Sequence, residues 1–125
     1  MYRLVLFAIM LEIHIIVDFH MQGILGKLKQ RSEWLNHPEY SDMYKDDWAI
    51  AMWLHAFEWT FSVMLPLAYV RGWNVGNGFG LMFVINMIIH ASTDHLKANL
   101  REINLVVDQL IHVTQLILTI LILYV

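Results

Sequence analysis

Residues 104–125 read NLVVDQLIHVTQLILTILILYV, a helix-length run that is apolar apart from one line of polar side chains. Asp108 and His112 are four positions apart, which places them on one face of a helix. Gln115 and Thr119 continue the same line, and the second half of the run has almost no other polar face to offer to water. A helix of this kind is typical of a bilayer span whose polar stripe faces partner helices.

The composition of the whole chain indicates the same environment. Of the 125 residues, 58% are hydrophobic and 15% are charged. Soluble domains normally carry about 25% charged residues. We therefore predict an all-α fold, a four-helix transmembrane bundle that forms a single integral-membrane domain over residues 1–125, with the lipid bilayer as its partner. The alternative is a soluble four-helix bundle with an unusually apolar surface.

Charge and cysteine content exclude several classes of protein. The formal net charge is -3 with His neutral, and no basic run is dense enough for nucleic-acid binding. The chain has no Cys, which removes disulfides, thiolate catalysis and thiolate-ligated metals. The first apolar segment has only Arg3 before it and no cleavage site after it, so we expect a retained helix rather than a signal peptide.

Four helices are expected, over about residues 2–26, 48–71, 79–100 and 104–125, with residues 27–47 as a polar loop or interfacial segment. A bilayer core of about 30 Å needs roughly 20 helical residues, and the first two segments meet this more clearly than the last two. Whether the segment 27–47 forms a lid stays open, as does the oligomeric state, a homo-oligomer included.

The basic residues predict the orientation. With four spans, the connections at 27–47 and 97–104 share one side and carry six Lys and Arg residues, against two on the other side. The positive-inside rule then places these connections in the cytoplasm and both termini outside it. We expect a multi-pass protein of a bacterial inner membrane.

Pairs of His and acidic side chains recur on all four expected helices. They are His14 with Asp18, His55 with Glu58, His90 with Asp94, and Asp108 with His112. Spacings of three or four place both members of a pair on one helix face. In an up-and-down bundle all four pairs fall at one depth, in the leaflet half nearest the basic connections. Ionisable groups in hydrocarbon cost about 2.5–3.5 kcal/mol each, so such a cluster predicts a bound ligand that offsets this cost.

Imidazole and carboxylate are ligands of zinc, manganese and iron. We therefore predict a divalent-metal site for one or two ions, with zinc preferred and manganese or iron as alternatives. The predicted ligands are His14, Asp18, His55, His90, Asp94, Asp108 and His112. A site of this kind predicts a metal-dependent hydrolase that acts on a lipid-like, lipid-linked or phosphate-bearing substrate near the membrane.

Three further residues are candidates for catalysis. Glu58 or Gln22 would position the attacking water. Lys97 lies nearly one turn past Asp94 and would reach the mouth of the site, where it holds a phosphate or extends to the headgroups.

Other interpretations of the same residues stay open. Chains of Asp, Glu and His also carry protons or cations in transporters and channels, although nothing polar lines a path to the far face. A single His–Asp pair on a helix is usually a local hydrogen bond, so the cluster can be structural in a bacterial or phage protein that engages a membrane partner. A bis-histidine haem fits less well, because a carboxylate lies one turn from each His.

The motifs resemble those of a known family. They are His14-x3-Asp18-Phe19-x2-Gln22 with Lys27, then His90-x3-Asp94-x2-Lys97, then Asp108-Gln109-x2-His112. In kind and order they are similar to the motifs of an uncharacterised family of small bacterial and phage membrane proteins, the domain-of-unknown-function family thirty-three-oh-seven. The resemblance covers nearly the whole chain and includes His55, but it implies no established activity. The layout is distantly similar to that of inner-membrane metal-dependent hydrolases.

Overall fold

The computed structural model describes residues 1–36 and 43–124, whose regular elements are all helices, without strands. The elements in chain order are α1 (Tyr2–Ile15), the π-helical segment η1 (Ile16–Met21), α2 (Gly23–Leu28), α3 (Arg31–Leu35), α4 (Asp47–Val70), α5 (Asn77–His95), the π-helical segment η2 (Leu96–Leu100) and α6 (Leu105–Leu123). The prediction of an all-α fold is confirmed.

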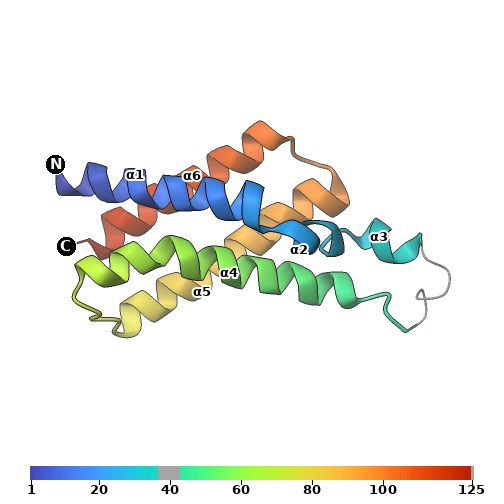
Figure 1. Ribbon diagram of the computed structural model, residues 1–125, viewed down its shortest axis with the longest axis horizontal. Helices are drawn as coiled ribbons and strands as arrows, with labels where there is room; N and C mark the ends of the chain where they lie inside the picture. Colours follow the sequence, from blue (N-terminus) through green and yellow to red (C-terminus); the bar gives the residue numbers. More distant parts are fainter. Residues whose placement is uncertain (37–42, 125) are drawn as a thin grey trace.

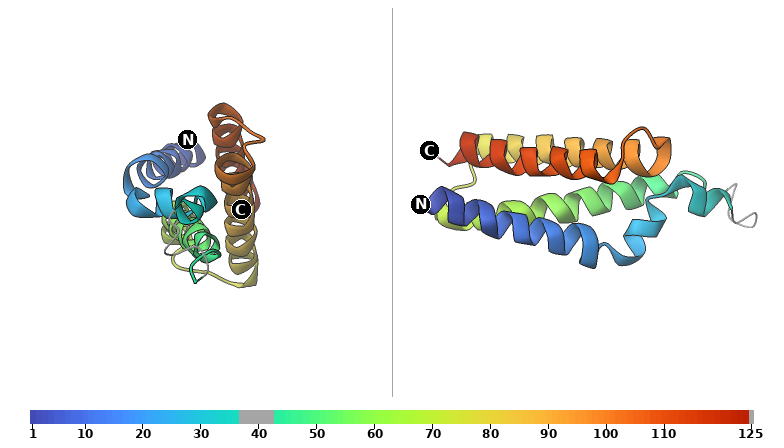
Figure 2. Two further views of the ribbon diagram at one scale, coloured as in Figure 1. Left: turned by 90° about the vertical axis from the view of Figure 1, so that its right-hand side faces the viewer. Right: turned by 90° about the horizontal axis from the view of Figure 1, so that it is seen from above.

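Four long helices set the architecture. The helices α1, α4, α5 and α6 extend along the long axis of the molecule, with both termini at one end and α3 at the other (Figure 1). Seen from above, α1 lies beside α4 in one layer and α5 lies beside α6 in the other (Figure 2). Contacts of α4 with α1 and α5, and of α6 with α1 and α5, close the bundle.

The helix expected over residues 2–26 is not continuous. The chain passes from α-helix to π-helix after Ile15 and turns at Gly23, whose φ of 42° lies in the left-handed region that favours glycine. In Figure 1 α2 leaves the direction of α1 at this turn. Segments of π-helix are rare and often mark functional sites.

The third expected helix, over 79–100, is also divided. It begins earlier, at Asn77, changes to the π-helical segment η2 after His95, and ends at Arg101 with a left-handed φ of 57°. The segment 27–47, expected as a polar loop or an interfacial segment, contains the end of α2 and the short helix α3. Its residues 37–42 lie outside the described part of the chain, and the question of a lid falls partly on them.

The interior divides into an apolar end and a polar end. Apolar side chains fill the bundle near the termini, among them Leu6, Met10, Val63, Met64, Leu67, Ile120 and Leu123. Two arginines fasten this end, because Arg3 donates to the carbonyl oxygen of Tyr124 at 2.9 Å and Arg71 donates to that of Leu123. Both guanidinium groups lie where the dipole of α6 is negative.

The outward faces of the long helices are apolar. Exposed large side chains include Leu4, Ile9, Ile50, Leu54, Phe61, Leu65, Leu81, Val84, Ile88, Leu110, Leu118, Leu121 and Ile122. Buried side chains include four His, three Asp and one Lys. An apolar exterior around a polar interior is the reverse of the distribution in soluble domains.

Two segments, Tyr2–Met21 and Leu105–Leu123, are long and apolar enough to cross a membrane by length and composition. Only 28% and 33% of the residues in their apolar windows are buried, whereas the core helix of a soluble protein is mostly buried. We expected the segment 48–71 to be a clearer span than 104–125, and the reverse holds. Inward-facing polar side chains of α4, such as His55 and Thr60, lower its mean hydropathy.

Two leucines of α6 test the packing directly. Leu116 is 1% exposed in the core and Leu118 is 49% exposed on the outer face. Leu116→Ala leaves a cavity and should lower the free energy of unfolding by about 2–5 kcal/mol. Leu118→Ala leaves none and should change it by no more than about 0.5 kcal/mol. Unfolding in detergent micelles measures both, and equal losses would contradict the packing described here.

Candidate metal centre

Six buried side chains from four elements converge at the polar end of the bundle. They are Asp18 of η1, His55 of α4, His90 and Asp94 of α5, and Asp108 and His112 of α6. None is more than 3% exposed. They form three overlapping groups in which the candidate ligand atoms lie within 4.8 Å of one another: Asp18 with His55 and His90, His90 with Asp94 and His112, and Asp18 with Asp108 and His112.

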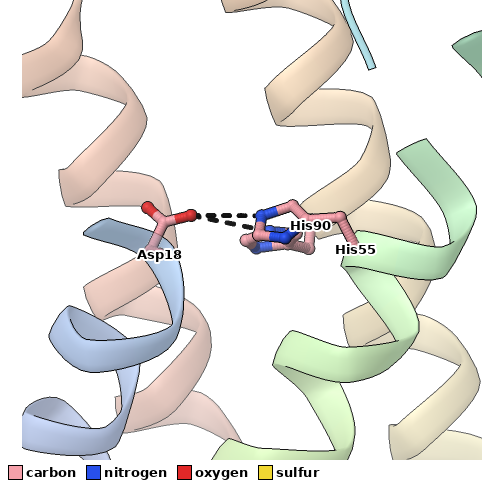
Figure 3. Close-up of side chains that lie close together, drawn as sticks. All are labelled: Asp18, His55 and His90. Atoms are coloured by element: carbon pink, nitrogen blue, oxygen red, sulfur yellow. Dashed lines mark hydrogen bonds and ion pairs between the residues drawn. The ribbon is translucent and has the colours of Figure 1, made fainter. Parts of the chain in front are cut away.

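Figure 3 shows the first group, in which the Asp18 carboxylate points towards the rings of His55 and His90. Asp18 Oδ1 is 3.4 Å from His55 Nε2 and 4.0 Å from His90 Nε2. The chain therefore brings a carboxylate of the first helix against imidazoles of two other helices.

The distances within the cluster fit ligands that share an ion better than direct hydrogen bonds. Further pairs are His55 Nε2 with Asp94 Oδ2 at 3.5 Å, His90 Nε2 with Asp94 Oδ2 at 3.6 Å, and His112 Nε2 with Asp108 Oδ1 at 3.4 Å. A typical N–H···O hydrogen bond is about 2.9–3.0 Å long. Two ligand atoms about 2.1 Å from one zinc ion lie about 3.4 Å apart at a tetrahedral angle.

Six atoms of the cluster have no hydrogen-bond partner among the residues that the structure describes. Two are His55 Nδ1 and His90 Nδ1, and four face neighbouring candidate ligands: His90 Nε2, His112 Nε2, Asp94 Oδ1 and Asp108 Oδ1. A buried polar atom left unpaired costs about 1–3 kcal/mol. A divalent ion bound by the last four atoms would satisfy them, so the residues fit a metal.

Gln109 holds one oxygen of each of two carboxylates in the cluster. Its Nε2 donates to Asp18 Oδ2 and to Asp108 Oδ2, both at 2.9 Å. The Oδ1 atoms of both residues are then left to face the imidazoles. Hydrogen bonds of this kind orient metal ligands in proteins and raise their affinity for the ion.

His14 lies beside the cluster but outside its three groups. Its Nδ1 accepts from Trp59 Nε1 at 2.8 Å, and its Nε2 is 2.9 Å from Gln109 Oε1. Because the Gln109 amide donates to the carboxylates, its oxygen accepts from His14, which assigns the proton to Nε2. Both ring nitrogens of the predicted ligand His14 are therefore in hydrogen bonds. The change to π-helix after Ile15 alters the direction of His14 relative to Asp18.

Aromatic packing fixes the rings at the centre. The His90 ring stacks on Trp59 with centroids 4.3 Å apart, and on its other neighbour, His112, with centroids 4.2 Å apart. Trp59 is fully buried. We did not single out Trp59 from the sequence, although it follows His55 by four positions and so shares its helix face.

Two lysines contact the cluster from the end that carries α2 and η2. Lys97 Nζ is 2.6 Å from Asp108 Oδ2, and its side chain is 29% exposed. Lys29 Nζ is 2.6 Å from Asp94 Oδ2, and its side chain is only 6% exposed. Lys97 was expected at the mouth of the site. Lys29 was missed, because no spacing pattern links it to a residue 65 positions away.

Asn99 holds the segment that carries Lys29. Its Oδ1 accepts from the backbone N–H of Arg31 at 2.7 Å, and its Nδ2 donates to the carbonyl oxygen of Lys29 at 3.2 Å. The π-helical segment η2 therefore fastens the start of α3 and positions both lysines.

The two residues predicted to hold a water, Gln22 and Glu58, lie outside the three groups. Gln22 Nε2 donates to the backbone oxygen of Asp18. Its Oε1 is buried, has no hydrogen-bond partner within the described ranges, and lies over Gly26. Glu58 is half-buried on α4. Their role in catalysis stays a prediction.

The polar stripes of α5 and α6 meet beyond the cluster. His112 Nδ1 is 3.0 Å from Gln115 Oε1, Gln115 Nε2 donates to the carbonyl oxygen of Asn86 at 3.0 Å, and Asn86 Nδ2 donates to Thr119 Oγ1 at 2.7 Å. Further towards the termini the interior is apolar. The polar interior is therefore continuous but ends inside the bundle.

Comparison of the chain with protein-family models, with curated proteins and with solved structures found no match. The resemblance based on the motifs is neither supported nor opposed by this result. Function has to be inferred from the geometry of the cluster.

Metal content tests the cluster. The purified protein should hold one or two equivalents of zinc, manganese or iron after dialysis, as measured by plasma mass spectrometry. His90→Ala and Asp94→Asn should each lower this content at least fivefold. His90 belongs to two of the three groups, and Asp94 lies close to three imidazoles. His20→Ala, which changes an exposed His of η1, is the matched control.

His14→Gln separates ligands from supporting residues. Metal content near that of the wild type would assign His14 to hydrogen bonding alone, and a loss equal to that of His90→Ala would make it a ligand. Absence of metal from the wild-type protein, even after incubation with each ion, would contradict the metal centre.

Proposed function

We propose that this chain is a four-span protein of a bacterial inner membrane that binds one or two divalent ions between its helices and uses them for hydrolysis. The observation that carries the proposal is the convergence of six buried His and Asp side chains, six atoms of which are unpartnered within the described part of the chain. Membership of the family of small bacterial and phage membrane proteins that the motifs resemble belongs to the same proposal.

The distribution of exposed side chains supports four spans rather than two. Besides the two segments that pass by composition, α4 and α5 expose apolar residues along their outer faces, among them Ile50, Leu54, Phe61, Leu81, Val84 and Ile88. Their polar residues His55, His90 and Asp94 point inward. A lipid environment is compatible with such helices, because only the outer face contacts the acyl chains.

The six ligands can serve one ion or two. Asp94 reaches different imidazoles with its two oxygens, since Oδ2 is 3.5 Å from His55 and Oδ1 is 3.9 Å from His112. A carboxylate used in this way can bridge a pair of ions. A set of His and Asp ligands with tetrahedral spacing favours zinc, with manganese or iron as alternatives.

The metal would supply Lewis acidity, which polarises the bond to be cleaved and makes a water nucleophilic at neutral pH. The remaining steps fall to this chain. Gln109 keeps Asp18 and Asp108 turned towards the imidazoles, and Trp59 keeps the His90 ring in place. In the reaction the oxygen of water bonds to phosphorus or to an acyl carbon, the bond to the leaving oxygen breaks, and that oxygen takes one proton of the water.

The apolar end of the bundle favours hydrolysis over transport. A conducting protein needs polar groups or water along its whole length. Beyond Asn86 and Thr119 the interior of the described helices is filled by apolar side chains such as Met64, Leu67 and Leu123. The cluster is therefore compatible with a site that opens to one side.

Single cysteines test the number of spans, because the chain has none of its own. Met43→Cys, Asn74→Cys and Glu102→Cys lie at exposed positions between the long helices. With four spans, an impermeant maleimide should label Asn74→Cys in intact spheroplasts and the other two only after lysis. With two spans all three positions share one side, and failure to label Asn74→Cys before lysis would contradict the four-span proposal.

A substrate screen tests hydrolysis. The zinc-loaded protein in maltoside detergent should cleave a fluorogenic phosphate or carboxyl ester, lose activity with a chelator and regain it with zinc. Asp94→Asn should lower kcat/KM at least 100-fold, because it removes a ligand close to three imidazoles. His20→Ala should retain activity. Proton flux through liposomes that persists with the chelator, without any ester cleavage, would favour transport instead.

A further inference from the structure

The two lysines at the cluster point to the chemical class of substrate. We propose that Lys29 and Lys97 bind the phosphoryl group of the substrate, so that the site takes a phosphate ester, from a soluble molecule or from a lipid headgroup. This inference rests on the metal-dependent hydrolase proposed above, and it concerns the substrate that the same site selects.

The inference rests first on the net charge of the cluster and its two lysines. The cluster contains three carboxylates, Asp18, Asp94 and Asp108, and two ammonium groups in contact with them. With neutral imidazoles these groups leave one negative charge. One divalent ion would change this to one positive charge, and two ions to three. A buried site with a net positive charge favours an anion, and phosphate binds well to lysine ammonium groups.

Snorkelling does not explain Lys29. Lys27 of α2 is exposed, whereas the side chain of Lys29, the residue that follows α2, is 6% exposed and its Nζ donates to Asp94 Oδ2 at 2.6 Å. A lysine that extends to the headgroups keeps its ammonium group in water. Lys29 instead turns its charge inward, onto a candidate metal ligand.

Neutralisation of the carboxylates does not by itself explain why charged pairs, rather than apolar side chains, stand here. A buried lysine–carboxylate pair contributes little net free energy, because desolvation of both charges offsets their attraction. Both lysines contact an Oδ2 atom, Lys29 on Asp94 and Lys97 on Asp108. Each ammonium group therefore lies directly against a candidate metal ligand, where an anion bound to the ion would meet it.

A basic cavity lies beside the segment that carries Lys29. It has a volume of about 230 Å³, lies between α3 and η2, and is lined by Arg31, Ser32, Leu35, Ala98, Asn99 and Arg101. Asn99 is the residue that holds the backbone of Lys29. Two guanidinium groups therefore lie close to this segment, and both attract a phosphate.

The test measures phosphate binding apart from catalysis. Protein in maltoside detergent is loaded with Mn²⁺, freed of excess ion, and titrated into inorganic phosphate or into bilayer nanodiscs that contain phosphatidic acid. Paramagnetic broadening of the ³¹P resonance reports phosphorus close to the ion. We expect broadening with the wild type and a reduction of at least fivefold in Lys29→Met and Lys97→Met at unchanged manganese content.

Controls fix the interpretation. Lys27→Met removes an exposed charge of α2 and should broaden like the wild type, and Lys97→Arg should restore most of the effect by keeping the charge. Should Lys29→Met fail to fold, Lys97→Met carries the test, because that side chain is partly exposed. Broadening by inorganic phosphate alone identifies a soluble phosphate source, and broadening by phosphatidic acid identifies a lipid headgroup; either supports the inference.

Two results would overturn it. If manganese is bound and both lysine variants broaden phosphate as the wild type does, or acetate displaces phosphate at equal concentration, the lysines do not select a phosphoryl group, and the metal centre stands without this substrate. If the wild type binds no manganese or zinc, the metal centre itself fails and the inference fails with it.

Discussion

The structure depends on the neutralisation of three carboxylates inside an apolar bundle. Asp18, Asp94 and Asp108 are each almost completely buried, and a bare carboxylate in such surroundings costs several kcal/mol. Their oxygens are shared among lysine ammonium groups, the Gln109 amide and the imidazoles. Asp18 and Asp108 turn Oδ2 towards Gln109 and Oδ1 towards imidazoles. Asp94 Oδ2 accepts from Lys29 and also lies 3.5 Å from His55 Nε2.

The two π-helical segments lie where the chain supplies a carboxylate and a lysine to the cluster. Asp18 lies within η1 and Lys97 within η2, and each segment continues an α-helix that carries another polar residue of the site. A π-turn changes the angle between side chains four residues apart. Asp18 can therefore point into the cluster while His14, four residues earlier, makes supporting hydrogen bonds. Gly23 and Arg101, which have left-handed φ angles, follow these segments, and the chain changes direction there.

Much of the fold and part of the site could be predicted from the sequence, because both depend on helical periodicity. Spacings of three and four residues placed the polar pairs on inward faces, and the structure brings six of the seven predicted ligands together. What periodicity does not contain is the rotation of one helix relative to another. Lys29 contacts the cluster from another helix, so no local spacing identified it. Gln109 follows Asp108 and Trp59 follows His55 by four positions, but these spacings do not show that their side chains reach Asp18 and His90 on other helices. The break at Gly23 escaped prediction because glycine permits a left-handed φ but does not require one.

The division of the interior into a polar and an apolar end gives the molecule a direction. Charged ligands with basic residues around them occupy the end near α2 and η2, while packed apolar side chains and the two arginines that hold the end of α6 occupy the other. Packing at the apolar end needs no ligand, whereas the polar end leaves buried atoms unpartnered within the described residues. In the proposed function, ions, water and substrate would reach the cluster from the polar end, because packed apolar side chains fill the other end. An interior filled at one end is compatible with hydrolysis at a membrane surface and is not compatible with conduction across the bundle.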